Sequence, residues 1–138
     1  MSGSVPTRDL APIVAFLPEL ESAGFSPGCW RGGAPGPSGV IQMPWFEFSP
    51  RMEALLAAIR GGGFVLMGFD WMTWLDSPEG RSLRNDPGRI EQAAEIELAR
   101  LLTAIIRGDR FIEGNIAGAF ESGHLLRIIR RMKTLLPL

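Results

Sequence analysis

The apolar residues between positions 98 and 132 have the clearest periodicity in the chain. In the first part of this stretch they recur at i, i+3, i+4, i+7 and i+8, the spacing that places side chains in one stripe along a helix. The residues of this stripe are Leu98, Leu101, Leu102, Ile105 and Ile106. We predict that this helix is the core of the domain and that Gly108 ends it as a left-handed residue.

Two more helices are predicted after a tight connector at residues 110–114. A short helix runs from about Asn115, its candidate N-cap, to Ser122, and Gly123 ends it. The last helix has its apolar stripe at Leu125, Ile128, Ile129 and Met132. Because no helix can bury such a stripe alone, we expect the three helices to pack on one another.

Prolines and glycines mark the helix ends in the first half of the chain. A first helix is expected from a cap at Thr7 to about Leu17, where Pro18 ends it. Ser49-Pro50 begins a second helix, which runs to Arg60. Three glycines at 61–63 end this helix, and they lack the lysine and hydroxyl residues that complete a phosphate-binding loop.

A β-hairpin is predicted between these two helices. Cys29–Arg31 forms one strand and Val40–Phe48 the other, with Pro44 indicating an edge strand or a bulge. Residues 32–39 have the sequence GGAPGPSG, which favours a flexible connection over regular structure.

The middle of the chain has weaker patterns. Phe64–Met67 is either a third buried strand or a core-filling loop. Ser77-Pro78 and Asp86-Pro87 are both a cap followed by proline, where helices begin. Residues 80–85 between them are predicted as one weak helical turn or a loop. The helix from Asp86 reaches Glu95, where it either breaks or continues into the next helix. The pattern as a whole predicts an α+β fold over one compact domain, residues 1–138. It is mostly helical, with a small antiparallel hairpin or three-stranded sheet packed against helices.

Several strings of the sequence are similar to those of a known family. The strings LLTAIIRGDRF, EG, AFESGH and LLRIIRRM, together with IQMPWFEFS and FVLMGFDWMTW, resemble a bacterial family known only as a domain of unknown function. The resemblance covers the chain from about Trp30 to Met132. Its motif is specific, because the long spacing mixes apolar and polar positions. It implies one compact α+β domain and no established activity.

Composition narrows the class of protein. Fourteen basic and fifteen acidic residues give a net charge of −1, so bulk charge indicates neither a nucleic-acid nor a membrane partner. Cys29 is the single cysteine, which excludes an internal disulfide and favours a reducing compartment. No apolar run approaches the roughly 18 residues of a membrane span, and no signal peptide is evident. We therefore expect a cytoplasmic protein.

The polar residues of the C-terminal helices are the candidates for catalysis. His124 is the only histidine, and with Glu113 and Glu121 it could form a general acid–base group, to which Asp70 could add a carboxylate. Helix capping and surface ion pairs are the ordinary alternatives for such residues. One histidine and scattered carboxylates have no metal-ligand spacing, so neither a metal nor a cofactor is expected.

Aromatic residues suggest a binding site. Trp71 and Trp74 follow Asp70 on a loop, and two indoles with one carboxylate could line a pocket; burial in the core is the alternative. The pair Asp109 and Arg110 could belong to a site or could satisfy the polar groups between two packed helices.

The last helix has a basic side. Arg127, Arg130 and Arg131 have a spacing compatible with the second helix of a helix-turn-helix, but they lie late on the helix, where DNA-reading helices use early residues. We therefore expect a solvated basic face, with nucleic-acid binding possible but not favoured. The best hypothesis is a small binding or regulatory module that contacts another protein or itself. The alternatives are a small enzyme and a nucleic-acid binder.

Overall fold

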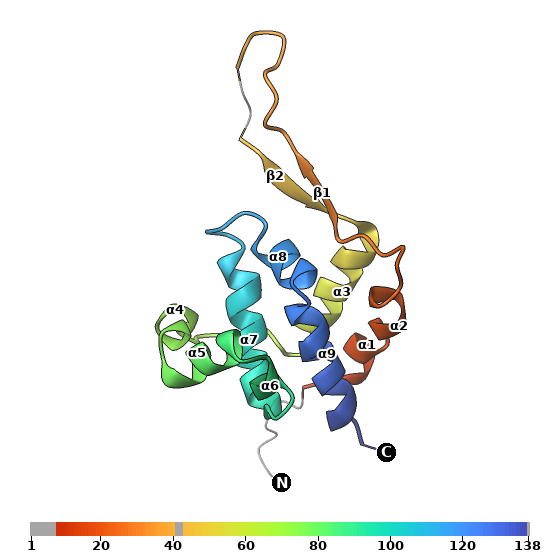
Figure 1. The fold of residues 1–138 in the computed structure, drawn as a ribbon, viewed down its shortest axis with the longest axis vertical. Helices are drawn as coiled ribbons and strands as arrows, with labels where there is room; N and C mark the ends of the chain where they lie inside the picture. Colours follow the sequence, from red (N-terminus) through yellow and green to blue (C-terminus); the bar gives the residue numbers. More distant parts are fainter. Residues whose placement is uncertain (1–7, 41–42, 138) are drawn as a thin grey trace.

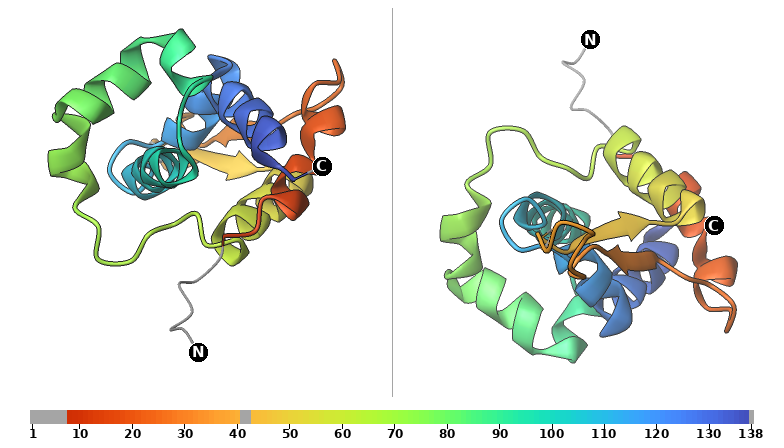
Figure 2. Two further views of the ribbon diagram at one scale, coloured as in Figure 1. Left: turned by 90° about the horizontal axis from the view of Figure 1, so that it is seen from below. Right: turned by 90° about the horizontal axis from the view of Figure 1, so that it is seen from above.

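Helix α7 (Glu95–Gly108) lies at the centre of the helical body. The computed structural model describes residues 8–40 and 43–137, and Figure 2 shows the other helices arranged around α7 when it is seen nearly end-on. The predicted stripe explains this position, because Leu98 and Leu102 have no exposed surface. At the start of the helix the Glu97 carboxylate accepts a hydrogen bond from the Ala94 amide at 2.8 Å, which satisfies one of the free N–H groups.

Two details of α7 differ from the prediction. Ile105 is half-buried, whereas the rest of the stripe is buried. Gly108 is the last helical residue and has no positive φ; the chain continues through Asp109 in the right-handed region. The glycine is needed for space, because a Cβ there would lie 2.9 Å from Nδ2 of Asn115.

The C-terminal helices form as expected, apart from one cap. Helix α8 (Asn115–Glu121) and helix α9 (His124–Leu135) are separated by Gly123, whose φ of +83° breaks the helix. Asn115 is not the N-cap of α8: Gly114 occupies that position with a φ of +85°. The capping oxygen comes from Asp109, which accepts from the Ile116 amide at 3.0 Å. The predicted apolar stripe of α9 is buried: Leu125, Ile128, Ile129 and Met132.

The predicted first helix is two short helices. These are α1 (Ala11–Val14) and α2 (Leu17–Leu20), and each has a proline in its first turn. Pro18 therefore lies near the start of a helix, where proline is tolerated, and does not end one. The expected cap at Thr7 lies outside the described residues. Helix α3 (Pro50–Gly61) confirms its prediction, because the Ser49 hydroxyl accepts from the Met52 amide at 3.1 Å.

The hairpin projects from one end of the helical body (Figure 1). Strands β1 (Gly28–Arg31) and β2 (Trp45–Phe48) are antiparallel, with Trp30 opposite Phe46. The second strand is shorter than predicted, since β2 begins at Trp45; Ile41 and Gln42 lie outside the described residues. Phe46 is buried and fixes the base of the hairpin to the body. Within the described ranges the sheet has these two strands, and residues 64–67 form the alternative that we predicted, a core-filling loop with Phe64 buried.

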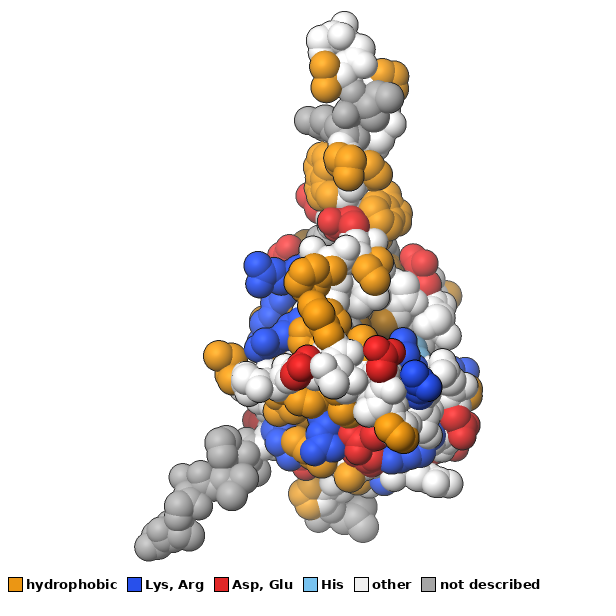
Figure 3. All heavy atoms as spheres, turned by 90° about the vertical axis from the view of Figure 1, so that its left-hand side faces the viewer, with side chains coloured by type: hydrophobic (Ala, Val, Ile, Leu, Met, Phe, Trp, Pro, Cys, Tyr) orange, Lys and Arg blue, Asp and Glu red, His pale blue; other side chains and the backbone are white. Residues whose placement is uncertain are grey.

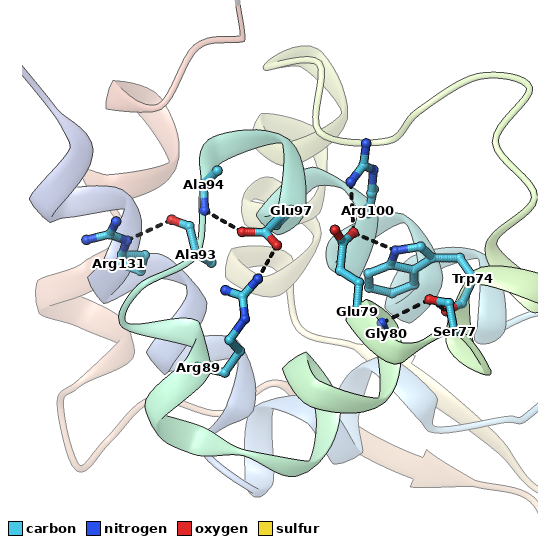
Figure 4. Close-up of polar contacts among 10 residues, drawn as sticks. All are labelled: Trp74, Ser77, Glu79, Gly80, Arg89, Ala93, Ala94, Glu97, Arg100 and Arg131. Atoms are coloured by element: carbon cyan, nitrogen blue, oxygen red, sulfur yellow. Dashed lines mark hydrogen bonds and ion pairs between the residues drawn. The ribbon is translucent and has the colours of Figure 1, made fainter.

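Three helices surround the other side of α7: α4 (Trp71–Leu75), α5 (Pro78–Asn85) and α6 (Pro87–Ile90). The predicted helix start at Ser77-Pro78 is confirmed, because the Ser77 hydroxyl accepts from the Gly80 amide at 3.1 Å. The prediction of a weak turn or loop at residues 80–85 was wrong, because α5 continues to Asn85. The helix predicted to continue from Asp86 to Glu95 ends at Ile90, and α7 begins separately. Figure 4 shows how the Glu79 carboxylate of α5 accepts from the Trp74 indole and from Arg100 of α7.

Candidate functional site

A groove opens between α4, α7 and the connector that leads into α8. Its volume is about 530 Å³, which is in the range of ligand sites in proteins. We call it the apolar groove, because its walls are mostly apolar side chains. They include Trp71 and Leu75 of α4, Leu101 and Ile105 of α7, and Phe111 and Ile112 of the connector.

The connector exposes two large apolar side chains at the mouth of the groove. Phe111 is 69% exposed and Ile112 is 65% exposed. The centroid of the Phe111 ring lies 6.0 Å from that of Trp71, with the two planes tilted by 44°, so the two aromatic rings pack against each other where they line the groove. Figure 3 shows hydrophobic side chains on the lower hairpin and, below acidic and other polar atoms at its base, again on this face of the body. Large exposed apolar side chains that gather on one face are typical of surfaces that bind another molecule.

Five polar or charged side chains line the groove: Arg84, Glu113, Asn115, Ser122 and His124. Oε2 of Glu113 accepts from the Phe46 amide at 3.0 Å, and Nδ2 of Asn115 donates to the Ile105 carbonyl at 2.8 Å. Burial lowers the pKa of His124 below its usual value, and the guanidinium of Arg127 lowers it further. The imidazole is therefore neutral at pH 7 and has both a donor and an acceptor.

Asp109 and Arg110 occupy the connector but have different environments. Burial raises the pKa of Asp109, with the Ile116 amide acting against the shift and the Glu113 carboxylate adding to it. Since Asp109 caps α8, its contact is the structural alternative that we weighed for this pair. Arg110 is exposed beside Phe111, and it forms no ion pair with any residue in the described part of the chain.

Three other predicted site residues do not line the groove. Asp70 accepts from the Thr73 amide at 3.1 Å and the Thr73 hydroxyl at 2.7 Å, so it caps α4; these bonds lower the pKa of Asp70. Trp74 is buried, and its indole nitrogen donates to Glu79 at 2.7 Å. Glu121 is exposed on α8. The structure therefore brings together Trp71, Glu113 and His124 from the candidates.

The arginines of α9 are divided between solvent and internal contacts. Arg130 pairs with Glu21 at 2.8 Å. Arg131 is half-buried, and its Nε donates to the Ala93 carbonyl at 2.9 Å, as Figure 4 shows. Arg127 is exposed. The basic side of α9 thus holds the N-terminal segment and the loop before α7 in place.

Sequence reasoning did not find the apolar residues of the connector, Phe111 and Ile112, or the groove-lining Asn115 as a site residue. The available signal was that two apolar residues lie next to each other in the polar connector RFIEG and belong to no apolar stripe of the predicted helices. The same stretch has no period, because a connector has no repeating face.

A family model matches residues 5–137, almost the whole chain, and its description is a family of unknown function, DUF6508. The chain belongs to this family. Membership in DUF6508 agrees with the resemblance inferred from the motifs and brings no activity with it. Neither a search of curated proteins nor a search of solved structures finds a match. Across residues 8–40 and 43–137, no helix is long and apolar enough to cross a membrane, and no cluster of side chains suits a metal ion.

Proposed function

We propose that this DUF6508 protein is a protein-interaction module whose apolar groove binds the apolar side of an acidic polypeptide segment. The observation that carries the proposal is the exposure of Phe111 and Ile112 at the mouth of an apolar groove. Aromatic side chains such as phenylalanine are enriched in protein interfaces relative to the rest of the surface. Cytoplasmic location belongs to the same proposal and rests on the single cysteine.

The charge around the groove supports an acidic partner. Arg84 lines the groove, Arg107 lies in the last turn of α7, and Arg110 lies next to Phe111. None of the three is in an ion pair with another described residue. The groove carboxylate, Glu113, already accepts the Phe46 amide. A segment with apolar residues on one side and carboxylates on its flanks therefore complements both the walls and the edge.

Two designed helical peptides test this proposal. The first peptide has leucines on one face of the helix and glutamates on the other. The second has lysine in place of every glutamate. Each peptide carries a fluorescent label, so that binding is measured by anisotropy titration. The acidic peptide should bind with a Kd of about 100 µM or below, and the basic peptide at least tenfold more weakly. Phe111→Asp should weaken the binding of the acidic peptide at least tenfold. The core should remain intact in this variant, because Phe111 is exposed.

A charge-matched pair of variants controls this experiment. Arg110→Glu should reverse the preference between the two peptides, whereas Arg60→Glu, an exposed site at the end of α3, changes the net charge equally and should not. Binding of the acidic peptide that survives Phe111→Asp, or equal effects of the two arginine variants, would contradict the proposal.

A small enzyme is the second candidate, because His124 and Glu113 line the same groove. The neutral imidazole could accept a proton from a bound molecule, with Glu113 as the nearby carboxylate. The hydrogen bond from the Phe46 amide to Glu113 favours a structural role for that carboxylate, which places the enzyme behind the binding module.

A further inference from the structure

The two edges of the hairpin are not equivalent. On β2, the Phe46 amide points out of the sheet, because it donates to Glu113 at 3.0 Å. Antiparallel ladders alternate between bonded and non-bonded pairs, so Phe46 and the opposite residue, Trp30, form a non-bonded pair. The N–H and C=O of Trp30 therefore point away from β2, along the outer edge of β1.

The outer edge of β1 is open at Trp30 in the described part of the chain, although at Gly28 the Ser26 hydroxyl accepts from the amide and donates to the carbonyl, both at 3.2 Å. The outer edge of β2 is occupied. Glu113 covers β2 at Phe46, and Pro44 just before the strand has no N–H to offer. Along β1, Cys29, Trp30 and Arg31 are all exposed, and Figure 1 shows the hairpin beyond the helical body. An unpaired edge is a template for another strand, and an isolated two-stranded hairpin is marginally stable in water.

We propose that two copies of this chain pair through their β1 edges, antiparallel about a two-fold axis at Trp30. The open edge is short, because Gly28 and Gly32 at its ends have φ values of +138° and +75°. A second β1 has the same length, and a two-fold axis makes the edge complementary to itself. Each Trp30 would donate its N–H to the partner's Trp30 carbonyl, extending the hairpin to a four-stranded sheet.

The side chains of β1 are compatible with this pairing. In this register Cys29 lies opposite the partner's Arg31, so no like charges face each other across the axis. Arg31 is already neutralised by Glu47 in its own chain. Trp30 lies on the edge strand and is 53% exposed, so a paired β1 would cover part of its indole, whereas Trp45 lies on β2 on the opposite face and stays outside the interface.

Two substitutions of Cys29 test the pairing, with self-association measured by sedimentation equilibrium. Cys29→Arg places arginine opposite the partner's Arg31, and the dimer should weaken at least tenfold; Cys29→Glu places a carboxylate there, and the dimer should persist. Within one chain Cys29 is opposite Glu47, so Cys29→Arg should stabilise the hairpin itself and Cys29→Glu should destabilise it. A loss of dimer caused only by an unstable hairpin would therefore appear in Cys29→Glu, and that order would overturn the proposal.

A crosslinking experiment checks the register. Cys29 and the partner's Arg31 form a non-bonded pair with Cα atoms about 4.5 Å apart, close enough for a disulfide, whereas the two Cys29 residues are diagonal and about 7–8 Å apart. Oxidised Arg31→Cys should therefore form a covalent dimer at low micromolar concentration, and the unsubstituted protein should not. A wild-type protein that is monomeric up to about 100 µM, or an Arg31→Cys variant that stays monomeric on oxidation, would refute the pairing.

Discussion

Thr103 connects α7 to the segment that crosses in front of it, and replacing it with valine should weaken that connection. The side chain is fully buried. Its hydroxyl accepts a hydrogen bond from the Leu66 amide at 2.8 Å. The same hydroxyl donates to the Ala99 carbonyl at 2.7 Å, and the Phe64 carbonyl is a second acceptor at 3.2 Å. Valine has a similar shape without the hydroxyl, so the Leu66 amide loses its partner while the packing around the site is retained.

The magnitude follows from two opposing terms. A partly buried donor left without a partner costs about 1–3 kcal/mol. The extra methyl of valine returns about 0.8 kcal/mol of apolar burial. The free energy of unfolding should therefore fall by about 0.5–2 kcal/mol in Thr103→Val. The control, Thr103→Ser, keeps the hydroxyl and loses a buried methyl, which costs about 1 kcal/mol.

Because the two variants lose similar amounts of stability, the decisive measurement is local. Hydrogen exchange followed by NMR should show that the Leu66 amide exchanges faster in Thr103→Val than in the unsubstituted protein. The increase in rate should be larger than the loss of global stability alone would cause. The amide should remain protected in Thr103→Ser. Unchanged protection of Leu66 in the valine variant would refute this account of Thr103.

Three further predictions concern the core, the histidine and the basic helix. Leu102→Ala should cost about 2–5 kcal/mol in a urea titration, and Ile105→Ala about 1 kcal/mol, because Ile105 is half-buried at the groove; the reverse order would contradict the fold. Because the pKa of His124 is lowered, the unfolded state binds more protons below about pH 6.5, so stability should fall as the pH drops from 7.5 to 5.5. His124→Gln should remove that dependence in thermal unfolding. Anisotropy with random duplex DNA should show no sub-micromolar binding that depends on Arg127 and on salt.

The sequence predicted the elements whose signals are local. Ser49-Pro50 is a cap followed by proline, and α3 begins there. The stripe of α9 is periodic and amphipathic, and the structure buries it as expected. Such signals depend on neighbours within a few residues, so one sequence contains them.

The remaining features depend on contacts between distant residues. Helix α5 buries only Leu83 and Gly80, so it has almost no apolar period; Gly80 is required because a Cβ would lie 2.1 Å from the Trp74 carbonyl oxygen. The cap of α8 comes from Asp109, six residues before the helix begins. The groove forms where α4, α7 and the connector between α7 and α8 come together. Helix α4 is far from the other two segments in the sequence, so no local pattern predicts that they are close in the structure. Among the site candidates, His124 and Glu113 were found by residue type, and their common location could not be.

The connector between α7 and α8 also has a thermodynamic consequence. Glu113 lines the groove and at the same time binds the Phe46 amide, while Gly114 lies against Trp30, where a Cβ would come within 2.5 Å of the indole. The groove and the hairpin therefore share one short segment of backbone. If a groove ligand moves this segment and so changes hairpin pairing by some factor, pairing must change the affinity of the groove by the same factor, because coupling free energies between sites are reciprocal. Measuring either equilibrium as a function of the other would give that factor directly.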